Sequence, residues 1–177
     1  MDTTEREISV SGTVSPRKVA AARFKAAMGS FAAGVTIITA VDEAGAPQGM
    51  TATAFSSVSL SPPLCLVCVN EQARTCQSIL SRGYFAVNML CADQHELSAR
   101  FASALADKYV GVAWMRGANT HCPLLVGALA RIECEVQGVH AAGDHCVIVG
   151  QPLSIDVADG SPLVYWRGSY SSLTNRT

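Results

Sequence analysis

The pattern of small, hydroxylated and apolar residues is most informative at residues 49–63, which read Gly-Met-Thr-Ala-Thr-Ala-Phe-Ser-Ser-Val-Ser-Leu-Ser-Pro-Pro. Alternate residues of a strand share a face, so a strand here carries Thr51, Thr53 and Ser57 on one side and small residues on the other. Such a strand leaves backbone N–H and C=O groups within reach of a flat, polar ligand. The two prolines end it, because proline has no N–H for the ladder. An edge strand with a solvated hydroxyl face explains the same pattern, and both interpretations stay open.

The hydrophobic periodicity along the rest of the chain predicts a mainly β protein. We expect helices at residues 17–31, 75–80 and 94–104, the last of them opened by Asp93 and Glu96 as a capping box. We expect strands at residues 35–41, 48–60, 64–69, 84–90, 129–139, 145–157 and 163–170. Many strands with few, peripheral helices predict a closed antiparallel barrel.

The ends and the irregular parts of the chain set its organisation. Residues 1–16 are polar and predict a flexible N-terminal tail, and residues 17–177 fit a single domain. Residues 106–123 have no clear period, and long irregular segments in compact domains are often functional, so we expect a rim or lid there.

Composition and charge exclude several classes of function. The net charge of −1 gives no electrostatic footprint for nucleic acid. No apolar run approaches the roughly 20 residues of a membrane span, and the N-terminus does not resemble a signal peptide. We therefore expect a cytoplasmic protein. No Gly-x-Gly-x-x-Gly element or Walker lysine is present, so neither a Rossmann nor a P-loop nucleotide site is indicated.

The seven cysteines are expected to be reduced thiols. Cys65 and Cys68 have the spacing of a metal or redox pair, but residues three apart on a strand face opposite sides, so we expect their thiols to diverge. His140, His145 and Cys146 have no second half with zinc-finger spacing. The sequence therefore predicts no metal site.

Two further segments carry candidate chemistry. Asn70 to Thr75 follows a buried strand and opens a helix, where free N–H groups and the side chain of Arg74 favour a phosphate. His145 follows a turn glycine at the start of a strand and is a candidate contact for an incoming ligand. Taken singly, these segments are more simply explained by an ordinary capped helix with a solvated arginine and by a surface or hydrogen-bonded histidine.

Seven motifs occur in one order over most of the chain. They are Phe31-Ala-Ala-Gly34-Val-Thr, the stretch from Gly49 to Pro63, Arg74-Thr75, Phe85-Ala-Val-Asn88, Cys122-Pro-Leu-Leu125, Gly143-Asp-His145 and Arg167-Gly168. With this set, the sequence resembles the flavin reductase components of two-component flavin-dependent monooxygenases, which share an FMN-binding split-barrel fold. Many members have Asp where this chain has Ser61, and Ser where it has Ala73.

The resemblance implies a Greek-key split barrel and an NAD(P)H:flavin oxidoreductase. It implies a homodimer that reduces FAD or FMN with NADH, or with NADPH, and releases the reduced flavin to a separate oxygenase. The residues implied for the flavin ring and ribityl chain are Thr51, Ala52, Thr53 and Ala54, and those for the phosphate end are Ser57, Gln72, Arg74 and Thr75. His145 is implied beside the nicotinamide as the catalytic candidate, with Arg167 and Tyr170 as weaker candidates.

Hydride transfer between two cofactors fits these residues, because the protein then has to stack two planar rings and needs no nucleophile of its own. Two alternatives remain. One is a non-catalytic split-barrel module that keeps flavin as a fixed prosthetic group, and the other is an enzyme resembling pyridoxamine-phosphate oxidase on a related barrel. The latter lacks the basic clustering that its substrate phosphate needs.

Overall fold

The computed structural model describes residues 18–171 and 173, so the tail predicted at residues 1–16 lies outside the described residues. The helices are α1 (Ala21–Gly29), α2 (Arg74–Arg82) and α3 (His95–Ala102). The strands are β1 (Ala33–Gly34), β2 (Thr36–Val41), β3 (Pro47–Ala52), β4 (Phe55–Leu60), β5 (Pro63–Asn70), β6 (Tyr84–Met89), β7 (Trp114–Arg116), β8 (Pro123–Leu125), β9 (Ala130–Ala142), β10 (His145–Val157), β11 (Val164–Trp166) and β12 (Ser169–Ser171). No helix in this part of the chain is long and apolar enough to cross a membrane.

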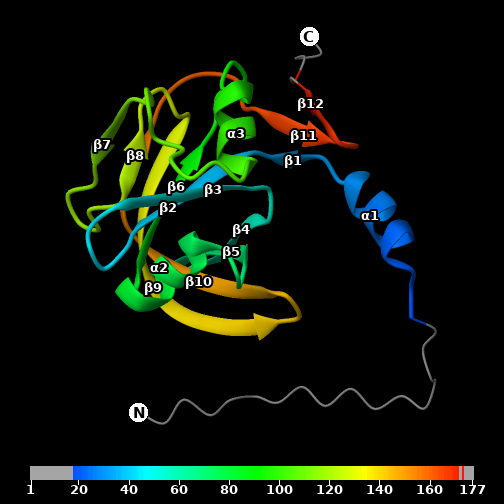
Figure 1. The fold of residues 1–177 in the computed structure, drawn as a ribbon, viewed down its shortest axis with the longest axis horizontal. Helices are drawn as coiled ribbons and strands as arrows, with labels where there is room; N and C mark the ends of the chain where they lie inside the picture. Colours follow the sequence, from blue (N-terminus) through cyan, green and yellow to red (C-terminus); the bar gives the residue numbers. More distant parts are fainter. Residues whose placement is uncertain (1–17, 172, 174–177) are drawn as a thin grey trace.

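Seven antiparallel strands form one sheet in the order β3-β2-β6-β9-β10-β5-β4. The two edge strands, β3 and β4, follow one another in the chain and are joined only by Thr53 and Ala54. The sheet therefore curls until its edges come together, and Figure 1 shows the resulting barrel with its helices at the periphery. This is the mainly β, antiparallel split barrel that the sequence predicts.

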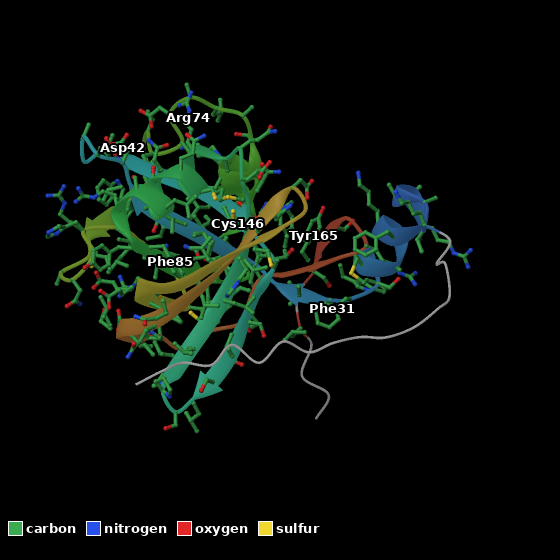
Figure 2. The ribbon with its side chains drawn as sticks, turned by 90° about the horizontal axis from the view of Figure 1, so that it is seen from below. Phe31, Asp42, Arg74, Phe85, Cys146 and Tyr165 are labelled. Atoms are coloured by element: carbon green, nitrogen blue, oxygen red, sulfur yellow. The ribbon has the colours of Figure 1, made fainter. Side chains whose placement is uncertain are left out.

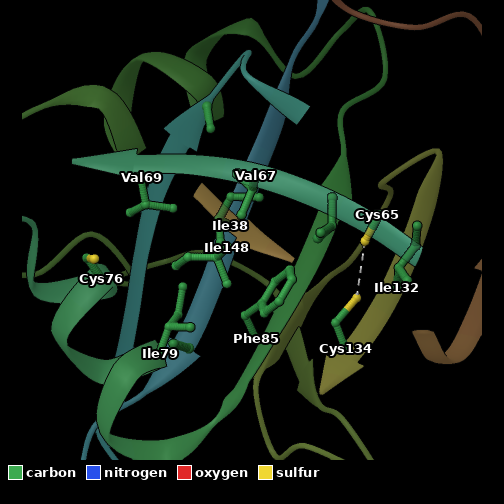
Figure 3. Close-up of a cluster of buried hydrophobic side chains, with 13 residues drawn as sticks. Ile38, Cys65, Val67, Val69, Cys76, Ile79, Phe85, Ile132, Cys134 and Ile148 are labelled. Carbon is green, nitrogen blue, oxygen red and sulfur yellow. Dashed lines mark hydrogen bonds between the residues drawn. The ribbon is translucent and has the colours of Figure 1, made fainter. Parts of the chain in front are cut away.

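The barrel interior is filled by alternate residues of its strands. Ile38, Val67, Phe85 and Ile148 are fully buried and pack in one cluster with residues of α2 (Figure 3). Gly150 lies beneath this cluster, where a Cβ atom would stand 2.5 Å from Cζ of Phe85. Only glycine at position 150 leaves room for the Phe85 ring to lie this close to the strand, so Gly150 determines how the ring packs.

A second cluster lies on the other face of the sheet, beneath α3. Phe101 from α3 is fully buried, and its ring meets that of Tyr109 edge to face at a centroid distance of 5.0 Å. Both rings press on Gly49, where a Cβ atom would come within 2.6 Å of Phe101 Cε1. Gly49 thus lets the aromatic pair hold β3 in place.

The helices differ from the prediction in two respects. The capping box predicted at Asp93 and Glu96 is wrong, because Gln94 occupies the N-cap position of α3 and no side-chain hydrogen bond caps the helix. Gln94 instead accepts a hydrogen bond from the Cys91 N–H at 3.0 Å. α1 has the expected apolar residues, but none of its residues is buried, and it extends away from the barrel (Figure 1).

Two of the predicted strands are each two strands. The strand expected at residues 48–60 is broken between β3 and β4, because the chain passes there from one edge of the sheet to the other. The strand expected at residues 163–170 is the hairpin of β11 and β12, which turns at Arg167 and Gly168, both with positive φ. This hairpin pairs with β1 in a separate small sheet.

Candidate functional site

The junction between β3 and β4 exposes backbone donors. β3 pairs with β2 as far as Ala52, and β4 pairs with β5 from Phe55 onward. Thr53 and Ala54 between them are exposed, and among the described residues neither backbone N–H has a hydrogen-bond partner. The Ala54 carbonyl accepts from the Cys68 N–H at 2.9 Å, which fixes the junction. The junction therefore offers two positioned donors to a ligand.

Thr51 and Ala52, which precede the junction, turn toward the protein. The Thr51 hydroxyl donates to the backbone oxygen of Ser98 in α3 at 2.6 Å. Ala52 is buried, and its carbonyl accepts from the Thr36 hydroxyl at 2.8 Å. These bonds hold β3 in position, whereas Thr53 faces solvent.

α2 begins without a side-chain cap. Its N-cap is Ala73, and no side-chain hydrogen bond reaches the first turn from there. Asn70 instead organises the preceding turn, since its side chain accepts from the Gln72 N–H at 2.9 Å. Gln72 and Arg74 are exposed and Thr75 is buried. An uncapped helix N-terminus next to a guanidinium group favours an anion.

A cavity of about 290 Å³ lies between β3, the start of α2 and the loop that follows α3. Arg74 and Thr75 line it, and so does Lys108 from the loop. The Lys108 ammonium group donates to the carbonyls of Phe101 at 2.8 Å and Gly49 at 3.2 Å. Burial lowers the pKa of Lys108, and the positive charge of Arg74 lowers it further. The cavity thus gathers two cationic side chains at the open end of a helix.

Lys108 lines this cavity and was not predicted from the sequence. The one signal was the irregular segment at residues 106–123, which was expected to form a rim, and its start does line the cavity. Ser57, which was predicted for the phosphate end, is exposed on β4 and is not among the residues that line this cavity. Figure 2 shows Arg74 and Asp42 at the same end of the barrel.

A second cavity of about 290 Å³ lies beside the junction and is mostly apolar. Thr53 and Phe55 line it together with Phe31, Gly34 and Leu163. Residues of the Phe31 motif and of the stretch from Gly49 to Pro63 therefore line the same cavity. Small and apolar walls of this kind suit the face of a planar ring.

His145 begins β10 and lies opposite Asn70 of β5. Its Nδ1 is 2.8 Å from the carboxylate of Asp144, and the hydrogen bond from His145 lowers the pKa of Asp144. The Asp144 carbonyl accepts from the Glu71 N–H at 3.2 Å. The turn between β9 and β10 is thus held against the segment that leads into α2, which brings His145 near the predicted phosphate end at Gln72.

Arg167 and Tyr170 lie in the hairpin of β11 and β12, away from the turn that carries His145 (Figure 1). The Arg167 guanidinium group stands 4.7 Å from the ring centroid of its neighbour Trp166. The Tyr170 hydroxyl is 2.9 Å from the hydroxyl of Ser98. Within one chain, Arg167 and Tyr170 therefore lie near α1 and α3 and not near His145.

The cysteine pair with metal-like spacing diverges as predicted. Cys65 is buried on the core face of β5, and Cys68 lies half-buried on its other face. In residues 18–171, no three or more His, Cys, Asp or Glu side chains are placed to hold a metal ion.

Comparison with known proteins shows the family of this chain. Residues 28–174 match the flavin reductase like domain. The chain is 36% identical over 168 residues to the flavin-dependent monooxygenase reductase subunit HsaB of Rhodococcus jostii, covering 94% of this chain and 85% of the relative. It is 39% identical over 155 residues to a flavin reductase (NADH) of Kitasatospora aureofaciens, covering 84% and 79%.

A solved structure of a related protein has the same fold. The NADH:FAD oxidoreductase SgcE6 of Streptomyces globisporus, in complex with NAD and FAD fragments, superposes with a TM-score of 0.82 at 32% identity, covering 86% of this chain and 92% of that one. The predicted fold class and the predicted flavin reductase activity are confirmed. The chain therefore belongs to the flavin reductase like domain family.

Proposed function

We propose that this chain uses NADH to reduce free FAD or FMN, and that it releases the reduced flavin to a separate monooxygenase component in the cytoplasm. The observation that carries the proposal is the cavity in which Arg74, Lys108 and the uncapped start of α2 converge beside β3. A flavin phosphate is the anion that this chemistry selects. The presence of NAD and FAD fragments with the related SgcE6 supports both cofactors.

The phosphate end is proposed to lie at α2. Arg74 makes no ion pair with any described carboxylate, so its guanidinium group is available to a ligand. Lys108 adds a second positive charge at a fixed place, because two backbone carbonyls already hold its ammonium group. Gln72, Thr75 and Ser57 remain proposed neutral contacts of the phosphate and ribityl chain.

The ring is proposed to lie along residues 51–54. The open N–H groups of Thr53 and Ala54 would donate to the polar edge of the ring, and charge that develops there on reduction would strengthen these bonds. The small side chain of Ala54 gives the ring room near the backbone. Flavin and nicotinamide, when bound, supply the hydride-transfer chemistry between them.

His145 is proposed to orient the nicotinamide. The carboxylate of Asp144 fixes the imidazole ring through Nδ1, which leaves Nε2 to face an incoming cofactor. Arg167 and Tyr170 remain weaker proposed contacts of the nicotinamide cofactor. NADH is proposed as the preferred donor over NADPH, because the names of several relatives specify NADH.

A homodimer is proposed from the exposed apolar side chains of α1 and of the residues just after it. Phe24, Met28 and Phe31 are 59%, 55% and 76% exposed, and Figure 2 shows Phe31 on the side of the molecule that carries this projecting helix. A second copy that covers these side chains removes them from water. Sedimentation velocity should give a dimer for the native chain and a monomer for Phe24→Glu, whereas Val110→Glu, at another exposed apolar position, should stay dimeric.

Initial rates of NADH oxidation test the proposed function directly. The rate should saturate with added free FAD or FMN, measured for both flavins with both NADH and NADPH. Arg74→Ala should raise the apparent flavin KM by about tenfold or more with a smaller effect on kcat, since a charge-assisted hydrogen bond is worth about 1.5 to 3 kcal/mol. Arg82→Ala, at the other end of α2, is the matched control.

Two results would contradict this reading. An unchanged flavin KM in Arg74→Ala would remove that residue from the site. Flavin that stays tightly bound through purification, without any NADH oxidation, would favour the alternative of a fixed prosthetic group.

A further inference from the structure

A groove of about 540 Å³ lies beside the cationic cavity, and the function proposed above assigns no ligand to it. Residues of α2 form one wall of this groove, and residues of the turn between β2 and β3 form the other. Arg74 and Gln48 line both spaces, so the groove and the cationic cavity meet at these two residues. Figure 2 shows Arg74 and Asp42, one from each wall, at the same end of the barrel.

The helix wall of the groove is a polar stripe. Arg74, Gln77, Ser78 and Ser81 follow one another at the three- and four-residue spacing of a single helix face. α2 packs into the barrel core through a different face, on which Ile79 is fully buried. The polar stripe is therefore not needed to hold the helix on the barrel, and its amide and hydroxyl groups are available to a ligand.

The turn wall carries two carboxylates. Asp42 is held in place, because its Oδ1 accepts from the Ala46 N–H at 2.8 Å and its Oδ2 accepts from the Gln48 amide at 3.3 Å. A carboxylate oxygen can accept more than one hydrogen bond, so Asp42 remains a positioned acceptor. Glu43 follows it and is exposed. Among the described residues neither carboxylate forms an ion pair with Arg74, which leaves the guanidinium group to a phosphate.

We propose that this groove holds the adenosine half of FAD and thereby makes FAD the preferred flavin. The inference rests on the proposed function, in which Arg74 holds the flavin phosphate. FMN ends at that phosphate, whereas FAD continues through a second phosphate into a ribose and an adenine. An FAD molecule with its first phosphate at Arg74 therefore has its remaining half at the point where the groove begins.

The chemistry of the groove matches an adenosine. Carboxylates accept hydrogen bonds from ribose hydroxyls, as they do in dinucleotide-binding folds, and a glutamine amide such as that of Gln77 can pair with N6 and N7 of adenine. The carboxylates of Asp42 and Glu43 repel a phosphate between them, so both phosphates of FAD stay with Arg74 and Lys108. The volume lies within the range of about 300 to 1,000 Å³ that is usual for small-molecule sites.

Initial rates of NADH oxidation with FAD and with FMN as separate acceptors test this assignment, and the native enzyme should have the lower KM for FAD. Glu43→Gln removes one carboxylate acceptor with little change of shape. It should raise the KM for FAD by about three- to tenfold, which corresponds to the loss of one hydrogen bond, and leave the KM for FMN unchanged. Glu96→Gln, which removes an exposed carboxylate from α3, is the matched control and should leave both values unchanged.

A second variant tests the space itself. Ser81→Trp places a large side chain in the groove and should abolish the preference for FAD without changing the KM for FMN. Leu80→Trp makes the same addition at the preceding residue, which does not line the groove, and should keep the preference. Both positions are exposed on α2, so both variants are expected to fold.

Three outcomes would overturn the proposal. They are equal KM values for the two flavins in the native enzyme, an equal change for both flavins in Ser81→Trp, and a higher KM for NADH in Glu43→Gln. The last result would assign the groove to the adenosine half of the nicotinamide cofactor instead. Failure of the proposed function would look different, because the native enzyme would then not oxidise NADH with either flavin.

Discussion

Glu133 is a buried carboxylate that forms no ion pair with the described residues, and its replacement by glutamine gives a sharp test of the structure. The side chain is 3% exposed on β9. It accepts hydrogen bonds from the backbone and side chain of Asn119, from the backbone and side chain of Thr120, and from Ser154, at 2.7 to 3.0 Å. The carboxylate thereby ties the loop between β7 and β8 to the main sheet.

The magnitude follows from the ionisation of this group. Burial by itself would raise the pKa of Glu133, but the hydrogen bonds from Thr120, Asn119 and Ser154 outweigh it and lower the pKa from 4.5 to about 2. The folded state therefore binds the proton less readily than the unfolded chain does. At neutral pH this difference stabilises the fold by about 3 kcal/mol, at 1.36 kcal/mol per pKa unit.

The direction of this pKa shift sets the pH range in which Glu133 stabilises the fold. The contribution is fully present above about pH 4.5 and is lost as the pH falls toward 2. Glu133→Gln keeps the shape of the side chain, yet one of its oxygens becomes an NH₂ group that faces donors. We therefore expect the variant to be less stable by about 3 kcal/mol at pH 7, or about 6 to 12 °C in Tm, and the difference to shrink steadily below pH 4.5.

Urea unfolding of the native chain and of Glu133→Gln at pH 7, 5.5, 4 and 3 measures the difference between their free energies of unfolding. The other carboxylates titrate equally in the two proteins, so their contributions to this difference cancel. Glu135→Gln is the matched control, because this half-buried carboxylate on the same strand accepts only from Gln137, at 3.4 Å. A stability difference for Glu133→Gln that does not change with pH would refute the argument from ionisation. Equal losses of stability in Glu133→Gln and Glu135→Gln would refute the role of Glu133 in holding the loop between β7 and β8.

Two further substitutions test the site and the core. His145→Ala should raise the NADH KM by about three- to tenfold, which corresponds to the loss of one hydrogen bond, and should leave flavin binding unchanged in steady-state kinetics and titration. His140→Ala on the same hairpin is the control. Loss of flavin binding in His145→Ala would mean that His145 is misplaced. Gly150→Ala should destabilise the fold by about 1 to 3 kcal/mol in urea unfolding, since its Cβ atom would stand 2.5 Å from Phe85. Gly138→Ala, whose nearest neighbour is 3.6 Å away, should be close to neutral, and equal losses at both glycines would contradict the steric argument.

The main sheet could be predicted from the sequence because its signals are local. β2, β5 and β6 are short runs of β-branched and apolar residues, and α2 ends at Gly83 with the left-handed conformation that a glycine stop supplies. The same local signals placed Arg74 at a helix start and His145 at the start of a strand. These positions needed no knowledge of distant contacts.

The parts that could not be predicted depend on partners far away in the chain. The break at Thr53 arises because β3 pairs with β2 and β4 with β5, which no local period reveals. Lys108 is held at the cavity by a hydrogen bond to the Gly49 carbonyl, which lies 59 residues away. The hairpin at Arg167 was missed since a non-glycine residue with positive φ leaves no clear mark in the sequence.

The size and openness of the cationic cavity favour exchange of flavin over permanent retention. Its volume of about 290 Å³ lies at the lower limit for sites that enclose a small molecule, which run from about 300 to 1,000 Å³. This cavity is proposed to take only the phosphate end of the flavin, and the ring is proposed to lie along residues 51–54, where Thr53 and Ala54 are exposed. Arg74 and the donors at Thr53 and Ala54 are themselves exposed. Contacts of this kind bind through a few polar groups and little buried apolar area, which limits affinity. The arrangement thus suits a flavin that binds, is reduced and leaves, and it argues against a fixed prosthetic group.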